Sequence, residues 1–370
     1  MSTPDHCNLR IPGPTPLPPE VQEATSRQMM NHRGAEFAAL LREVIAGLRP
    51  IFQTTGDIFL FAASGTGGME AAVANTISPG DKVLAVSMGA FGDRFAEIAA
   101  AYGANVVKLS VPWGQAAEPE DILRELHVHP DCRVLLVTQN ETSTGVTNDI
   151  AAIGSALRTL GDRAPLLVVD AISALASIEM NMDGWGCDIV VAASQKGLMS
   201  PPGLAPVAVG PRVWSYVERC KSPRFYFDFV AARRYLAEGS TPATPAVSLV
   251  YALHRALSLL AAEGLPQVYT RHRHLAAKTR QGLRDLGFKL LADDRHASGS
   301  VTAAYLPAGV DGAAWLKQLR QEHGVVLGSG QGPLKGKIFR VAHMGYVTEK
   351  DINHVLVALQ AMLHANSPVT

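Results

Sequence analysis

The chain has 370 residues, and 47% of them are hydrophobic, which predicts two or three domains with a substantial buried core. Its 33 Lys plus Arg residues balance its 33 Asp plus Glu residues, so no net field favours nucleic acid or an anionic membrane surface. No uncharged apolar stretch is long enough to span a membrane, and the first 20 residues lack the apolar segment of a signal peptide.

The four cysteines show neither a Cys-x-x-Cys motif nor the spacing of a zinc site. Scattered thiols in a chain of this length are typical of a reducing compartment rather than of a disulfide framework. We therefore expect a cytoplasmic protein without a metal site.

Residues 1–20 contain a dense run of prolines, which opposes a helix and predicts an extended N-terminal arm. Helical patterns follow at residues 20–30 and 36–52. Strand and helix patterns then alternate, which predicts a large α/β domain over residues 21–255.

The strands of this domain are continuous apolar runs, as expected for a mostly parallel seven-stranded sheet covered by helices on both faces. They are expected at residues 58–62, 82–87, 106–109, 134–138, 166–170, 189–193 and 205–209. The helices between them are expected at residues 68–76, 91–102, 119–126 and 150–160.

After Pro245 the helical patterns outnumber the strands, which predicts a smaller α+β domain over residues 256–370, hinged near residues 245–265. Its helices are expected at residues 246–263, 268–286, 312–322 and 349–364, and its strands at residues 301–306 and 337–342.

Asp170 and Lys196 each follow a buried apolar strand. Such strand ends open onto one edge of a parallel sheet, where ligands bind. A desolvated amine can attack an aldehyde, and a carboxylate can keep a pyridine nitrogen protonated. The pair therefore indicates pyridoxal phosphate (PLP). The alternatives are a surface charge at a loop for Lys196 and a helix cap for Asp170.

A glycine-rich turn with Thr66, Gly67 and Gly68 connects a strand to a helix. Free N–H groups at a helix start bind anions, so this turn is either a phosphate cup or a tight turn that needs glycine. The polar run 139–145 also follows a strand. It either contacts the cofactor ring through Thr142 or its neighbours, or caps the next helix.

Two further residues, Arg340 and Phe91, have two interpretations each, and a third, His343, has one. Arg340 binds a substrate carboxylate through two parallel hydrogen bonds, or it is a surface arginine. Phe91, at the start of a helix, stacks on the ring or packs in the core. His343 is expected to be packed or hydrogen-bonded rather than catalytic.

Eight segments, taken together and in order, resemble the class V aminotransferases of PLP fold type I. The resemblance is greatest to the alanine–glyoxylate, serine–glyoxylate and serine–pyruvate branch. The segments begin at Pro12 (PGPTPLPP), Asn31 (NHRGAEF), Ser64 (SGTGGMEAA), Asn140 (NETSTGV), Val169 (VDAIS), Ser194 (SQKG), Thr241 (TPATPAVSL) and Lys337 (KIFRVAHMG).

The resemblance implies a role for each candidate residue. Lys196 would bond to the PLP aldehyde and then shuttle a proton, and Asp170 would pair with the ring nitrogen. The other implied contacts are the phosphate with Thr66, Gly67, Gly68 and Gln195, the ring with Phe91 and Thr142, and the substrate carboxylate with Arg340.

Thr244 would reach the phosphate of the neighbouring subunit, which implies a homodimer. Relatives usually add a Tyr near Thr244. Here residues 241–243 supply no phenol, so one donor is missing or Tyr226 replaces it.

The expected activity is transfer of an amino group from a small L-amino acid, serine or alanine, to glyoxylate or pyruvate, by a ping-pong mechanism. The alternatives are a PLP-dependent lyase, a transaminase of a ureido-amino acid or a pyridoxamine-like amine, and a non-catalytic regulator on the same fold. A cysteine desulfurase would need a nucleophilic Cys on a mobile loop, and residues 324–336 contain none.

Overall fold

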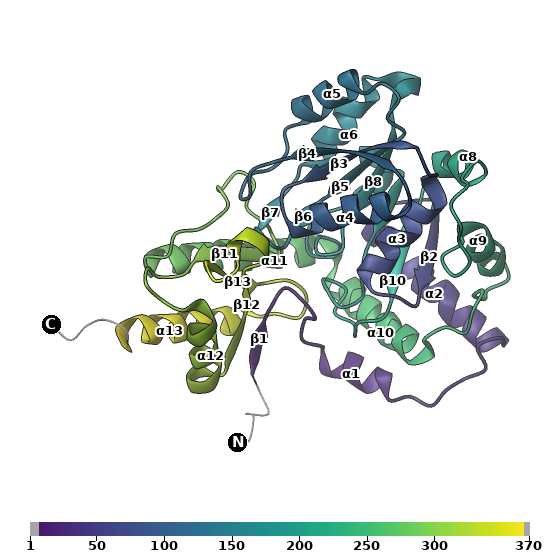
Figure 1. Cartoon of the computed structure of the whole chain (residues 1–370). Coiled ribbons are helices and arrows are strands. Elements are labelled where there is room, and N and C mark those ends of the chain that lie inside the picture. The colour runs from purple at the N-terminus through teal and green to yellow at the C-terminus, as the bar shows by residue number, and fades with distance from the viewer. Residues whose placement is uncertain (1–6, 366–370) are drawn as a thin grey trace.

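The computed structural model describes residues 7–365. Residues 1–6 of the predicted arm and 366–370 of the predicted C-terminal domain lie outside this range. A seven-stranded sheet forms the centre of the larger part of the molecule (Figure 1). Six of its strands run the same way, and β10 is antiparallel to both neighbours.

The strand order of this sheet is β2-β10-β9-β8-β5-β3-β4. The strands are β2 (Asp57–Phe61), β3 (Lys82–Ser87), β4 (Asn105–Ser110), β5 (Val134–Thr138), β8 (Leu166–Asp170), β9 (Ile189–Val191) and β10 (Ala205–Val209). The prediction of a mostly parallel, seven-stranded sheet is confirmed.

Helices cover both faces of the large sheet because successive residues of a strand point to opposite sides. Leu84 and Val86 of β3 belong to one core, and Val83 and Ala85 belong to the other. The first core also contains α2 (Ala35–Phe52), α5 (Pro119–Val128), α6 (Ile150–Arg158) and α10 (Val247–Glu263). The second contains α3 (Gly65–Thr76), α4 (Ala90–Ala101), α8 (Trp214–Val217) and α9 (Phe229–Ala237).

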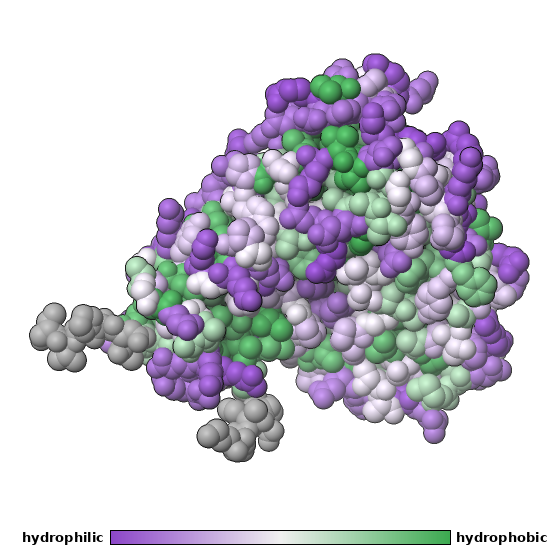
Figure 2. All heavy atoms as spheres, in the orientation of Figure 1, coloured by the Kyte–Doolittle hydropathy of each residue, from purple (hydrophilic) through white to green (hydrophobic). Residues whose placement is uncertain are grey.

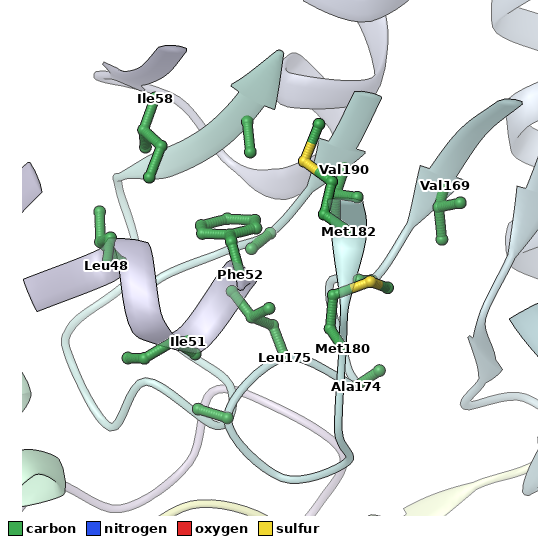
Figure 3. Packing of buried hydrophobic residues seen from close by; sticks show 14 of the residues in the cluster. Leu48, Ile51, Phe52, Ile58, Val169, Ala174, Leu175, Met180, Met182 and Val190 are labelled. Carbon is green, nitrogen blue, oxygen red and sulfur yellow. The ribbon is translucent and has the colours of Figure 1, made fainter. Parts of the chain in front are cut away.

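Figure 3 shows how the first core is packed. Phe52 of α2 lies next to Leu175 and between Leu48 and Met182, and all four are nearly or completely buried. Each large apolar side chain buried in this way contributes roughly 1.5–3 kcal/mol to folding. This packing fixes the loop after β8, which carries Leu175, against the sheet.

A second, four-stranded sheet lies beside the first, in the order β1-β12-β13-β11 (Figure 1). Its edge strand β1 comes from the N-terminal arm and pairs in parallel with β12, whereas the other pairs are antiparallel. The strands are β1 (Asn8–Arg10), β11 (Val301–Tyr305), β12 (Val325–Ser329) and β13 (Ile338–Ala342). The helices packed with them are α11 (Leu265–Asp285), α12 (Gly312–His323) and α13 (Glu349–Ala365).

The remaining elements are short. They are α1 (Pro19–Thr25), the two-stranded pair β6 (Asn140–Glu141) and β7 (Val146–Thr147), α7 (Met182–Trp185), and the 3-10 helices Gly161–Arg163, Pro211–Val213 and Gly332–Leu334.

The structure shortens one predicted helix and adds strands that were not predicted. The helix expected at residues 20–30 ends at Thr25, where the backbone N–H of Ser26 closes the last turn on Glu23. Strand β12 was not predicted, and neither was the pairing of residues 8–10 in a sheet. The predicted domain boundary between residues 255 and 256 falls inside α10 and stays a prediction.

Hydrophilic residues line most of the rim of the face shown in Figure 2. Within residues 7–365, none of the helices combines the length and the apolar character that crossing a membrane requires.

Candidate active site

Asp170 is the last residue of β8 and pairs with Thr138 at the carboxyl end of β5. Its side chain is 3% exposed, and one carboxylate oxygen accepts a hydrogen bond from the N–H of Ile172 at 2.9 Å. Burial raises the pKa of Asp170 to about 7; the N–H of Ile172 opposes this rise, and the charge of Glu141 adds to it. The ion pairs within 4 Å in residues 7–365 do not include Asp170. The carboxylate is therefore buried without an ion pair, and the charges of Lys196 and Arg94 oppose the rise of its pKa.

Lys196 lies in the turn after β9, half-buried. Burial lowers the pKa of its amine to about 8; the charge of Asp170 opposes this shift, and that of Arg340 adds to it. A larger share of the amine is therefore neutral and nucleophilic near neutral pH than for a lysine in water. The structure thus brings together Asp170, Lys196 and Arg340, which are far apart in sequence.

The N-terminal arm forms one wall around Lys196. The amine donates a hydrogen bond to the carbonyl of Pro12, and the N–H and hydroxyl of Thr15 bond the carbonyls of Gln195 and Lys196 at 3.1 and 3.2 Å. Gly13 has a φ of +131°, a backbone conformation that favours glycine, and a Cβ added there would lie 2.5 Å from the Lys196 amine. The sequence analysis gave these arm residues no role.

Arg340 lies in the middle of β13 and is 6% exposed. Its Nε donates to the carbonyl of Ser329 at 2.9 Å, and its Nη1 donates to the carbonyl of Thr142 at 2.8 Å. Burial lowers the pKa of the guanidinium to about 10, and the charge of Glu141 opposes this shift, so the group stays a cation near neutral pH. Two of its five N–H donors are used in this way, and the others can bind a carboxylate.

Glu141 is completely buried and was missed by the sequence analysis. One carboxylate oxygen accepts hydrogen bonds from the N–H groups of Phe91 and Gly92 at 3.0 and 3.1 Å. The other accepts from the N–H and hydroxyl of Ser143 at 3.1 and 2.6 Å. Burial raises the pKa of Glu141, and these four hydrogen bonds oppose the rise. Glu141 thus holds the start of α4, which carries Phe91, next to the segment that carries Thr142.

The glycine-rich turn forms the first turn of α3, where a helix leaves N–H groups without intrahelical partners. Its N-cap, Ser64, makes no side-chain hydrogen bond to these groups, so they can bind an anion. The hydroxyl of Thr66 accepts from Arg94 at 3.5 Å, and the Arg94 guanidinium lies 5.0 Å from the centre of the Phe91 ring. Arg94, which the sequence analysis did not single out, adds a positive charge beside this turn.

Gly68 has a second reason to be glycine. A Cβ at this position would lie 2.7 Å from Cγ1 of Val191 and 3.2 Å from Cβ of Ala205. The added Cβ of Gly67 would lie 2.7 Å from that of Ala63. Close packing thus accounts for these glycines, so they are not evidence of a phosphate site by themselves.

Gln195 and Thr244 differ in position. The Oε1 of Gln195 is buried and has no hydrogen-bond partner among the described residues. It can therefore accept a hydrogen bond from a ligand. Thr244 is exposed and lines a different pocket together with Tyr226 and Thr241. The structure therefore does not bring Thr244 to the group around Lys196 within one chain.

His343 is buried and bonded on both ring nitrogens, to the hydroxyl of Thr302 at 3.0 Å and the carbonyl of Gly299 at 3.2 Å. The prediction of a packed, hydrogen-bonded histidine is confirmed.

Comparison with known proteins adds independent findings. The model of the family Aminotransferase class-V matches residues 9–355. The chain is 39% identical to the soluble hydrogenase small subunit of Synechococcus sp., over 97% of this chain and 93% of that protein. It is 38% identical to the L-aspartate–glyoxylate aminotransferase of Paracoccus denitrificans, over 92% of this chain and 86% of that protein. An alanine–glyoxylate aminotransferase structure from Nostoc sp. superposes with a TM-score of 0.93 at 32% identity, covering 98% of this chain and 96% of that chain.

Proposed function

Since the chain belongs to the class V aminotransferases, whose model matches residues 9–355, we propose that it is a PLP-dependent transaminase acting on small L-amino acids and 2-oxo acids. PLP, when bound, supplies an electron sink for the substrate α-carbon. The observation that carries the proposal is the buried Asp170 carboxylate, which makes no ion pair within 4 Å and interacts with the charge of the Lys196 amine.

The described residues fit this cofactor. A protonated ring nitrogen would give Asp170 its missing cation, and a cation there would lower the pKa of the carboxylate again. The free N–H groups of α3, the hydroxyl of Thr66 and the Nε2 amide of Gln195 would donate hydrogen bonds to the phosphate. Phe91 would stack on the ring and Thr142 would contact its hydroxyl.

Lys196 would hold the cofactor through Nζ and then take the proton from the substrate α-carbon. Its lowered pKa, about 8, suits a base that works near neutral pH. Arg340 would hold the substrate carboxylate in a fixed direction, because its side chain is anchored by two backbone carbonyls. The arm carbonyl of Pro12 would be released when the amine bonds to the cofactor.

The proposed donor is alanine or serine and the proposed acceptor is glyoxylate or pyruvate. Glyoxylate is supported by the names of the Paracoccus and Nostoc relatives. The donor would give up its amino group and leave as a 2-oxo acid before the acceptor binds. This order predicts ping-pong kinetics. We place the protein in the cytoplasm as a homodimer, with Thr244 and Tyr226 facing the second subunit.

The proposal is tested by incubating the PLP-loaded chain with alanine, serine or aspartate and with glyoxylate, pyruvate or 2-oxoglutarate. We expect glycine to form from glyoxylate with at least one donor, and Lys196→Ala to abolish it. If PLP binds but no amino group reaches any acceptor, the transaminase proposal is wrong. A product released from the donor without an acceptor would instead identify a lyase.

A further inference from the structure

A cleft of about 760 Å³ lies between α11 and the loops beside α6 and α7. Ser177 and Asp149 line it from the side of the large sheet, and Arg280 and His296 line it from the other side. Lys196, Asp170 and Arg340 do not line it. Its volume is in the range of ordinary small-molecule sites, and no step of the proposed reaction uses it.

One face of α11 forms a wall of this cleft. The lining residues Tyr269, Arg273, Ala276 and Arg280 follow one another at intervals of four, three and four residues. This spacing places them in one stripe along the helix. The stripe therefore points two guanidinium groups and one phenol toward the same space.

The two arginines of the stripe have no carboxylate within 4 Å among residues 7–365. Arg280 is half-buried and donates to the carbonyl of Ser298 at 3.0 Å, and Arg273 donates to the hydroxyl of Thr270 at 2.9 Å. Both retain unused N–H donors.

The acidic residues of the cleft already have partners. Glu118 pairs with Arg295 at 2.7 Å, and Asp149 accepts from the N–H of Ala152 at the start of α6. Glu179 accepts from Gln53 at 3.3 Å. Each of these three carboxylates is thus bonded within the fold, whereas the guanidinium groups of Arg273 and Arg280 keep free N–H donors.

Two hydroxyl groups of the cleft are buried and unpaired. Ser177 is 2% exposed and Tyr269 is 7% exposed, and neither hydroxyl has a hydrogen-bond partner in the described part of the chain. Burial raises the pKa of Tyr269 to about 12, with a further rise from Glu179, so the phenol keeps its proton and can donate. Buried hydroxyls without partners are rare and costly, which favours a ligand that satisfies them.

From these observations we infer that the cleft binds a small organic anion, through salt bridges from Arg273 and Arg280 and hydrogen bonds from Ser177 and Tyr269. The anionic group is a carboxylate or a phosphate. Ser177 also packs against the segment that carries Lys196. A Cβ added to Gly197, the residue after Lys196, would lie 2.6 Å from the Ser177 hydroxyl. This inference does not depend on the transaminase proposal, since binding can be measured without turnover.

The test is isothermal titration of the full chain, saturated with PLP to fill the proposed phosphate cup, with citrate and with inorganic pyrophosphate. We expect at least one probe to bind. Arg280→Gln should weaken binding roughly 10- to 100-fold, as for a charged hydrogen bond. Tyr269→Phe should weaken it about 3- to 10-fold without lowering the thermal midpoint, because it breaks no hydrogen bond of the folded chain.

The matched control is Arg320→Gln, which makes the same charge change at an exposed position of α12 outside the cleft, and should leave binding unchanged. Binding of citrate alone identifies a carboxylate ligand, and binding of pyrophosphate alone identifies a phosphate ligand. Binding of neither probe overturns the inference, and so does wild-type affinity in both Arg280→Gln and Tyr269→Phe. If Arg280→Gln does not fold, Tyr269→Phe decides the matter.

Discussion

Asp170 is buried and Lys196 is half-buried, both where their charged forms are disfavoured, and this affects how stability depends on pH. From pH 3.8 to about 7 the folded chain keeps a proton on Asp170 that the unfolded chain releases, so Asp170 makes stability fall. From about pH 8 to 10.5 the unfolded chain keeps a proton on Lys196 that the folded chain has lost, so Lys196 makes stability rise. The two contributions together predict a minimum between about pH 7 and 8 for the chain without cofactor.

The measurement is the urea midpoint of the cofactor-free chain from pH 4 to 10, compared with Asp170→Asn and Lys196→Met. The wild-type minus Asp170→Asn difference should fall across the acidic range, and the difference for Lys196→Met should rise across the alkaline range. Flat differences would mean that these two groups titrate normally in the folded chain.

Glu141 gives a second prediction at the level of one residue. In Glu141→Gln the amide nitrogen would face N–H or O–H donors that the carboxylate now accepts, either those of Phe91 and Gly92 or those of Ser143. We expect the free energy of unfolding to fall by about 1–3 kcal/mol, measured by urea titration. Glu120→Gln, at an exposed position of α5, is the control and should change it by less than about 0.5 kcal/mol. An equal effect of the two changes would contradict the buried role of Glu141.

These residues differ in how far the sequence could predict them. Asp170 and Lys196 follow apolar runs, so their place at a sheet edge could be inferred from the local pattern. The role of Glu141 could not, because two of its donors are the N–H groups of residues 91 and 92, about 50 positions away. Pro12 and Thr15 contact a segment about 180 positions away, and a contact of that kind leaves no periodic signal.

At the level of elements, the fit of α3 against the sheet gives a third prediction. Gly68→Ala would push a methyl group against Val191 and Ala205, and overpacking of this kind costs roughly 1–3 kcal/mol. We expect a lower urea midpoint for the variant even without PLP. Gly47→Ala, inside α2, is the control, because its Cβ would meet Leu257 at a looser 3.2 Å and should cost less. A normal midpoint with weakened PLP binding would show that Gly68 acts on the cofactor alone.

The sequence predicts some helices and strands more accurately than others. The strands β3, β5, β8 and β10 match their predicted residues, because continuous apolar runs between polar turns mark a strand buried on both faces. Strand β12 was missed because its five residues include Gly328 and Ser329, which weaken the pattern. The helix expected at residues 20–30 was too long, since its helical pattern continues beyond the turn that ends α1.

At the level of the whole molecule, the proposed homodimer can be tested on its exposed aromatic residues. Phe225 is 95% exposed and Tyr226 is 46% exposed, beside the pocket that Thr244 lines. Large exposed apolar side chains that lie together mark contact surfaces. Phe225→Asp should therefore shift the wild-type dimer toward monomer in sedimentation velocity at low concentration. Val128→Asp, at another exposed apolar position, should not. A monomeric wild type would remove the proposed role of Thr244.

The N-terminal arm reaches both sheets within a few residues. Asn8 to Arg10 pair with β12, and Pro12 and Thr15 contact the Lys196 segment. A chain shortened to begin at residue 16 would leave β12 as a bare edge, open to pairing with other molecules, and would uncover the amine to water and reagents. Aggregation and faster acylation of Lys196 should then appear together, as two symptoms of a single missing segment.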